Sequence, residues 1–166
     1  MNNNSIMHKW IEIHLEAIEN NLLEIRRRLG DETHLIAVLK ADAYGMGAGE
    51  TAHILSLNGV DFFAVTFLNE AMDLRARGME EDILIFSPLS SGEARVAVEK
   101  NCILTIGCLE DLDTAEKAAK RVGQTARLHI KVDSGLGRFG ASWDETMEMV
   151  QTAAASSFVV IEGIYT

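Results

Sequence analysis

The chain has 166 residues, of which 48% are hydrophobic, and this is enough apolar material for one domain with a substantial core. Its 15 basic and 25 acidic side chains give a formal net charge of −10, which argues against nucleic acid or an anionic membrane as a partner. No apolar run reaches the roughly 20 residues that a membrane-spanning helix needs, and the first ten residues lack the apolar stretch of a secretory signal.

The first predicted element is an amphipathic helix over residues 15–30. Apolar side chains recur at intervals of three or four residues, at Leu15, Ile18, Leu22, Ile25 and Leu29. This spacing places them on one face of a helix, and Gly30 ends the pattern. The basic run at 26–28 lies on the same helix with Glu24 beside it, so we interpret the run as a solvated helix face.

After this helix, short apolar runs alternate with helical patterns along the chain. The apolar runs cover residues 34–40, 61–65, 82–86, 102–106, 127–132 and 158–166. The helical patterns between them cover residues 49–59, 69–79, 90–101, 109–123 and 143–156. Runs that are rich in Val, Ile and Leu and apolar on both faces are typical of parallel strands covered by helices. The pattern therefore predicts an α/β fold with about six βα units and a parallel sheet.

Periodicity alone does not separate a doubly wound sheet from a (β/α)₈ barrel, since both begin with repeated βα units. Six units are two fewer than a closed barrel contains, and a barrel usually takes about 250 residues. The last apolar run also reaches the end of the sequence with no helical pattern after it.

Polar residues follow several of these runs, where parallel folds place their functional groups. Lys40 ends the first run, residues 133–138 follow the fifth, and Tyr165 lies at the end of the sixth. Taken alone, Lys40 suits either a lysine whose ammonium group reaches solvent or a lysine that forms a Schiff base with an aldehyde. The three glycines that follow it would let a cofactor approach the backbone, whereas GMGAGE lacks the lysine of a phosphate-binding loop.

The segment HIKVDSGLGRFG places His129, Lys131 and Asp133 on one face of a strand by alternation. That face suits a barrel interior or a ligand site, and it suits a solvent-facing edge equally well. Lys131 and Arg138, with glycines between and after them, are suited to an anionic group of a ligand. We interpret the two cysteines as buried free thiols of a reducing cytoplasm and not as metal ligands.

Several segments resemble alanine racemase, in the order and spacing of that family. They are WIEIHLEAIENNL (10–22), AVLKADAYGMG (37–47), FFAVTFLNEAMDLR (62–75), KVDSGLGRFG (131–140) and EGIYT (162–166). The KADAYG run is the most specific of these, because related cofactor carriers of the same fold also have a lysine at this strand end but not that run. Met46 departs from the family, which commonly has histidine at this position.

The resemblance implies a pyridoxal-phosphate enzyme of fold type III, with a (β/α)₈ barrel and a separate C-terminal β-domain, that works on alanine as a head-to-tail dimer. It implies that Lys40 forms the Schiff base with pyridoxal 5′-phosphate and handles the α-proton of D-alanine. Tyr44 resembles the tyrosine near the cofactor phosphate. Arg138 resembles the arginine on the cofactor's phenolic oxygen and near the substrate carboxylate. Lys131 resembles a lysine that is carbamylated in some members and then orients that arginine.

By the same resemblance, residues 1–166 are expected to be the N-terminal part of the barrel domain, an incomplete barrel without the C-terminal β-domain. The second base, a tyrosine of the partner subunit, and the histidine stacked on the cofactor ring are expected to lie outside this chain. We therefore expect the full-length protein, and not these residues alone, to supply D-alanine for the cell wall. Two alternatives stay open: a non-catalytic pyridoxal-phosphate carrier, and a barrel part that binds nothing and assembles through its open edges.

Overall fold

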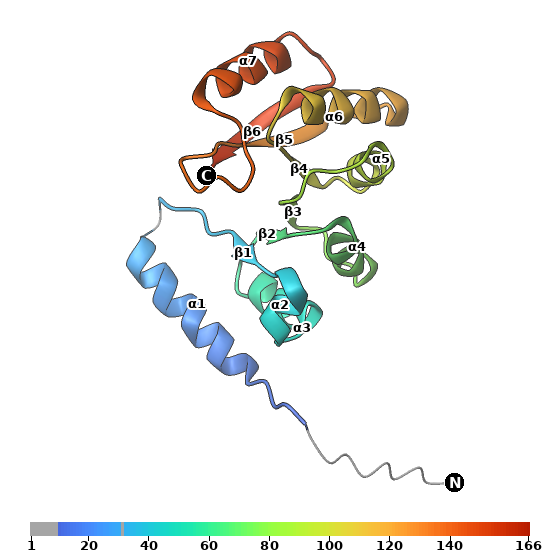
Figure 1. Ribbon diagram of the computed structural model, residues 1–166. Coiled ribbons are helices and arrows are strands. Elements are labelled where there is room, and N and C mark those ends of the chain that lie inside the picture. The colour runs from blue at the N-terminus through green and yellow to red at the C-terminus, as the bar shows by residue number, and fades with distance from the viewer. Residues whose placement is uncertain (1–9, 31) are drawn as a thin grey trace, which may run out of the picture.

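The computed structural model describes residues 10–30 and 32–166. Six parallel strands form one sheet in sequence order: β1 (Ala37–Val38), β2 (Phe62–Val65), β3 (Asp82–Ile85), β4 (Ile103–Ile106), β5 (Ala126–Lys131) and β6 (Val159–Tyr165) (Figure 1). A doubly wound sheet reverses its strand order at a switch point, whereas a barrel adds each strand beside the preceding one. The unbroken order β1 to β6 confirms the prediction of barrel-type βα units, about six of the eight in a closed barrel.

Seven helices surround the sheet or lie beside it in the described residues. They are α1 (Leu15–Leu29), α2 (Lys40–Gly45), α3 (Ala48–Leu57), α4 (Leu68–Ala76), α5 (Ser91–Glu99), α6 (Leu109–Val122) and α7 (Trp143–Ala154). The helices α4, α5 and α6 follow one another along the outer side of the curved sheet, while α1 packs beside α3 (Figure 1). Each long helix falls within three residues of the pattern that predicts it. The helices α3 to α7 bury apolar residues in the core, whereas α1 buries Leu22 and packs beside α3.

The main hydrophobic core lies between the sheet and the outer helices. Its largest fully buried strand residues are Phe63, Val65, Ile83, Ile85, Ile106, Leu128 and Ile130. The residues between these positions point to the inner side of the sheet, where Ala64, Leu84 and Ile103 form a second, smaller cluster with Phe86 and Tyr165. The strands are therefore apolar on both faces, as their composition predicts.

The first strand is shorter than the apolar run that predicts it. Only Ala37 and Val38 pair with β2, and the chain then turns at Leu39, whose amide still donates to the carbonyl oxygen of Ala64 at 2.8 Å. Residues 41–44 have φ angles between 53° and 57°, so α2 contains a left-handed turn built from four consecutive non-glycine residues. Lys40 consequently begins this turn and does not continue the strand.

The basic run on α1 is only partly a solvated face. Arg27 and Arg28 pair with Glu24 on the surface, as predicted. Arg26, however, donates to the carbonyl oxygens of Asn58 and Gly59 at 2.6 and 2.7 Å. It thereby satisfies carbonyl groups at the end of α3, which a solvated side chain would leave to water.

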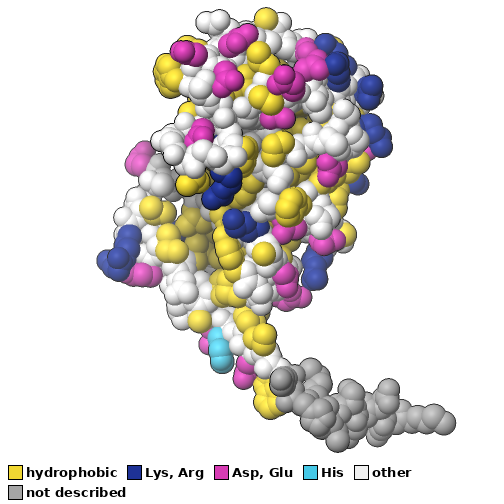
Figure 2. Space-filling view, in the orientation of Figure 1, with side chains coloured by type: hydrophobic (Ala, Val, Ile, Leu, Met, Phe, Trp, Pro, Cys, Tyr) yellow, Lys and Arg dark blue, Asp and Glu magenta, His cyan; other side chains and the backbone are white. Residues whose placement is uncertain are grey.

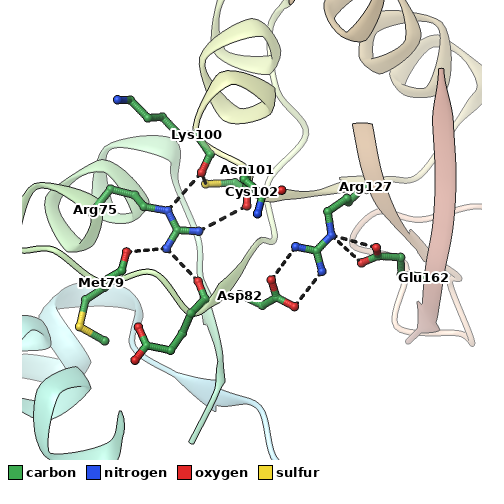
Figure 3. A network of polar contacts seen from close by, with 9 residues as sticks. Arg75, Met79, Asp82, Lys100, Asn101, Cys102, Arg127 and Glu162 are labelled. Atoms are coloured by element: carbon green, nitrogen blue, oxygen red, sulfur yellow. Dashed lines mark hydrogen bonds and ion pairs between the residues drawn. The ribbon is translucent and has the colours of Figure 1, made fainter. Parts of the chain in front are cut away.

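Two arginines, Arg127 on β5 and Arg75 on α4, connect neighbouring elements of the fold (Figure 3). Arg127 on β5 donates two hydrogen bonds to Asp82 on β3, at 2.5 and 2.7 Å, and a third at 2.8 Å to Glu162 on β6. A register shift between β5 and β6 adds a residue to β6 in this region. The hydrogen bonds from Arg127 hold the pKa of Asp82 below its ordinary value. Arg75 donates to four backbone carbonyl groups nearby.

Candidate active site

A cavity of about 430 Å³ lies where the strands end on their C-terminal side. Its walls are Lys40, Thr66, Phe86, Ser87, Lys131, Leu136, Arg138, Phe139, Tyr165 and Thr166. These residues follow or end the strands β1, β2, β3, β5 and β6, so the parallel sheet brings together groups that are up to 126 positions apart in the sequence. The volume is within the range of about 300–1,000 Å³ that is usual for small-molecule sites.

Three of the four residues that the sequence indicates meet in this cavity. Lys40, Lys131 and Arg138 all line it. Tyr44 does not: it is 63% exposed, and its ring centroid lies 5.9 Å from the Lys40 amine. Tyr44 therefore lies beside Lys40 but outside the wall of the cavity.

Lys131 lies among aromatic rings at the end of β5. Its amine is 5.4 Å from the ring centroid of Phe139 and 5.6 Å from that of Tyr165, and it donates to the carbonyl oxygen of Val132 at 3.2 Å. An ammonium group over ring faces is stabilised by the negative potential of the rings. Lys131 and Arg138 thus line the same cavity, and Lys131 forms no ion pair with the described residues.

The loop that carries Arg138 is fixed by Asp133. One oxygen of Asp133 accepts the amides of Gly135 and Gly137, both at 3.0 Å, and these hydrogen bonds lower the pKa of the carboxyl group. Gly140 closes the loop with φ at 128°, and a Cβ there would come within 3.0 Å of backbone atoms of Lys131 and Asp133. The glycines of the segment 131–140 thus allow the loop to fold back over the end of β5 and bring Arg138 to the cavity.

Tyr165 forms one wall, which the sequence indicates only as a polar residue at a strand end. Its hydroxyl group is 2.9 Å from the hydroxyl of Thr105 on β4, and burial raises its pKa. His129 lies next to it, 8% exposed, with its ring edge-on to Phe62. Because it is buried, His129 belongs to the inner face of the sheet and not to a solvent-facing edge, and this burial lowers its pKa.

The donor set fits pyridoxal 5′-phosphate. A primary amine, Lys40, is available for the aldehyde, and two cations, Lys131 and Arg138, are available for anionic oxygens in the same cavity. Phe86 and Tyr165 supply apolar surface for a ring. The sequence pattern did not point to Phe86, Ser87 or Thr105, because none of them belongs to a motif with a recognisable spacing. Thr66 lies within the segment 62–75, but nothing in the sequence marked it as a site residue.

Comparison with known proteins gives a consistent result. The family model "Alanine racemase, N-terminal domain" matches residues 13–166. Alanine racemase 2 of Oceanobacillus iheyensis is 36% identical over 157 residues, which is 95% of this chain and 40% of that protein.

Solved structures of two racemases are similar to this chain. Alanine racemase from Bacillus anthracis with bound L-Ala-P is 34% identical, with a TM-score of 0.85 over 95% of this chain and 41% of that one. A histidine racemase from Leuconostoc mesenteroides is 27% identical, with a TM-score of 0.85 over 99% of this chain and 45% of that one. The chain thus spans about 40% of the length of the relatives that it matches.

Proposed function

The chain belongs to the alanine racemase family, and on that premise we propose that it forms the cofactor-binding part of a pyridoxal-phosphate-dependent racemase that interconverts L- and D-alanine. The observation that carries this proposal is the meeting of Lys40, Lys131 and Arg138 in one cavity at the carboxyl ends of the strands. A relative with the same fold acts on histidine, so the choice of alanine rests on the larger number of alanine racemases among the similar proteins.

Lys40, Tyr44, Lys131 and Arg138 each have a proposed part in the reaction. The cofactor supplies an electron sink for the charge that develops at the substrate Cα. Lys40 would hold the aldehyde of the cofactor and carry the α-proton at its Nζ on one face of the substrate. Arg138 would bind the phenolic oxygen of the cofactor and the carboxylate of the amino acid, and Tyr44 the phosphate. Carbamylation of Lys131 would replace a cation by an anion and so provide a partner for Arg138.

Racemisation needs a base on each face of the substrate, and we propose that the second base comes from outside these 166 residues, in a homo-oligomer. This proposal is supported by the fact that the chain spans only about 40% of the length of its relatives.

We also propose a cytoplasmic protein that contributes D-alanine to the cell wall. The free thiols of Cys102 and Cys108 are consistent with a reducing compartment. No helix in the described residues is long and apolar enough to cross a membrane.

The proposal is tested by measuring the conversion of L-alanine to D-alanine by the full-length protein with added pyridoxal phosphate. Lys40→Arg keeps the charge but cannot form the Schiff base, so we expect the rate to fall by at least about 10²-fold. Lys117→Arg, on the exposed face of α6, is the matched control and should leave the rate unchanged. Cofactor binding without conversion of any amino acid would instead indicate the carrier, and conversion of histidine but not alanine would refute the proposed substrate.

A further inference from the structure

The side chain of Glu70 joins two segments that are distant in the sequence. Glu70 lies in the first turn of α4, partly buried, beside the end of β2. One carboxylate oxygen accepts the amides of Thr66 and Phe67 at 2.8 and 2.9 Å. The other oxygen accepts the amide of Ala41 at 2.7 Å, across 29 positions of the sequence. Ala41 is the residue directly after Lys40.

The segment that Glu70 holds is conformationally unfavourable by itself. A left-handed conformation costs about 1–2 kcal/mol for each residue with a Cβ, and residues 41–44 adopt it in succession. The far end of the turn is held by Asp42, whose carboxylate accepts the amide of Ala48 at 2.7 Å. The near end is held by Glu70, because the Ala41 amide, at the start of the turn, donates to it.

Other glutamates show what Glu70 does in addition to capping. Glu93 accepts the amide of Ser90 at the start of α5, and Glu145 accepts the amide of Ser142 at the start of α7. Both contacts stay within three residues of the glutamate and serve the helix that contains it. Glu70 makes the equivalent contact to Phe67 and also accepts the Ala41 amide in the turn that follows β1. The contact to Ala41 therefore does not serve the start of α4 but holds a separate segment of the chain.

We propose that Glu70 is a positioning residue for Lys40: it fixes the left-handed turn at its first amide and so sets the direction in which Lys40 enters the cavity. The inference rests on the proposed function, since it assigns to Lys40 the reaction with the cofactor aldehyde. Glu70 also joins the turn after β1 to the residues directly after β2, which connects Ala41, next to Lys40, to Thr66. Glu70 itself does not line the cavity.

Replacement of Glu70 by glutamine separates the two contacts. A carboxylate accepts on both oxygens, whereas an amide accepts on one and donates from the other. The glutamine oxygen is expected to face the pair of amides from Thr66 and Phe67, which leaves its NH₂ group against the Ala41 amide. Glu70→Gln therefore keeps the cap of α4 and disconnects the turn after Lys40. Glu93→Gln is the matched control, because it perturbs a cap of the same kind at α5 only.

The experiment uses the full-length protein and two readouts that do not depend on turnover. The first is hydrogen exchange of the Ala41 amide, and the second is the rate at which pyridoxal phosphate, trapped with borohydride, labels Lys40. Loss of a hydrogen bond to a charged group raises the equilibrium constant for local opening of the backbone by about 10- to 100-fold. Hydrogen exchange of the Ala41 amide should therefore accelerate by that factor in Glu70→Gln. Labelling of Lys40 should slow by about tenfold, and Glu93→Gln should change neither.

Each outcome has one meaning. If pyridoxal phosphate does not label Lys40 in the unaltered protein, the proposed function fails, whatever Glu70 does. If Lys40 is labelled but Glu70→Gln changes neither readout, the role of Glu70 is refuted. Should Glu70→Gln fail to fold, the unaltered protein still decides: the Ala41 amide must be protected as strongly as those of Thr66 and Phe67. Free exchange at Ala41 would show that the contact is absent and would overturn the inference.

Discussion

At the scale of single residues, the packing of His129 on the inner face of the sheet requires a glycine at position 163. The ring of His129 on β5 lies against Gly163 on β6, and a Cβ at that glycine would come within 2.5 Å of the ring. His129 is buried and has Phe62 beside it, so the ring has little room to move. The absence of a side chain at position 163 is therefore a packing requirement of the histidine.

Gly163→Ala should lower the free energy of unfolding by about 1–3 kcal/mol, because overpacking forces a buried side chain to shift. Gly92→Ala is the control: a Cβ there meets open space, and alanine favours the helix by up to about 1 kcal/mol. Urea unfolding of the two variants measures both effects. Equal stability of Gly163→Ala and the unaltered protein would mean that the ring of His129 is not held in this position.

The ion pair between Asp82 and Arg127 predicts a dependence of stability on pH. Because the pKa of Asp82 lies below its ordinary value of 3.8, the carboxylate stabilises the fold above that value, and this contribution is lost as the pH falls through the lower pKa of the folded state. Asp82→Asn should therefore cost about 1–2 kcal/mol near neutral pH, a range that allows for the 37% exposure of its side chain. The difference from the unaltered protein should shrink as the solution becomes acidic.

Urea unfolding at a series of pH values from about 7 to about 3 measures that difference. Asp113→Asn on α6, which removes an exposed pair with Lys117, is the control and should cost about 0.5 kcal/mol or less. A cost of Asp82→Asn that stays constant across the pH series would contradict the assignment of the effect to this ion pair.

At the scale of elements, the turn after β1 is the feature with the least favourable backbone. Four non-glycine residues with φ near 55° are held there by Glu70 and Asp42. Ala41 is exposed, so substitutions at this position report on the backbone more than on packing. Their effect on stability should follow the ease with which each residue type adopts a left-handed conformation.

Ala41→Gly should raise the free energy of unfolding by up to about 1 kcal/mol, because glycine adopts the left-handed region without a steric penalty. Ala41→Val should lower it by about 1 kcal/mol or more, since a β-branched side chain is poorly tolerated at positive φ. Thermal or urea unfolding gives the order of the three proteins. The reverse order, with valine more stable than glycine, would show that Ala41 is not left-handed in solution.

The repeated elements could be predicted from the sequence, and this turn could not. The strands β2 to β6 and the helices α3 to α7 follow from apolar periodicity, since each has one face or both faces buried against a neighbour. The apolar run 34–40 instead suggested a strand through Lys40, and nothing in KADAYG signals a left-handed backbone, which is usually marked by glycine. The contacts of Glu70 and Glu162 depend on register and on a bulge, which tertiary packing decides.

The candidate site could likewise be predicted only in part from the sequence. Lys40, Lys131 and Arg138 could be placed in one cavity from their positions at strand ends, since parallel strands all end on the same side of the sheet. Thr105, on the other hand, becomes part of the site only because the hydroxyl of Tyr165 reaches it across β5. Tyr44 belongs to the most specific motif, yet its side chain is exposed and does not line the cavity.

At the scale of the whole molecule, the six-stranded sheet has two edges within the described residues, at β1 and at β6. Hydrophobic side chains gather in the middle of one face, with basic side chains beside them (Figure 2). Val160 and Ile164 on β6 are 42% and 59% exposed, which is unusual for the strands of a parallel sheet. Sheet edges and uncovered apolar faces of this kind favour pairing with another chain.

We therefore expect the isolated 166-residue chain to associate. The net charge of −10 opposes open-ended aggregation, so a small closed oligomer should form. Light scattering at micromolar concentrations gives the mass directly. A mass equal to that of one chain at every concentration would mean that the edges are protected.

The isolated chain contains Lys40 but is not expected to contain the second base. It should therefore produce no D-alanine from L-alanine above the background of free pyridoxal phosphate.

The most direct test of the account is the identity of the lysine that reacts with the cofactor. Lys40 and Lys131 line the same cavity, so the chemistry of the cavity alone would permit either. The full-length protein is loaded with pyridoxal phosphate, reduced with borohydride, digested and mapped by mass spectrometry. We predict that the pyridoxyl group is on Lys40, and a label on Lys131 or on any other lysine in its place would contradict the account.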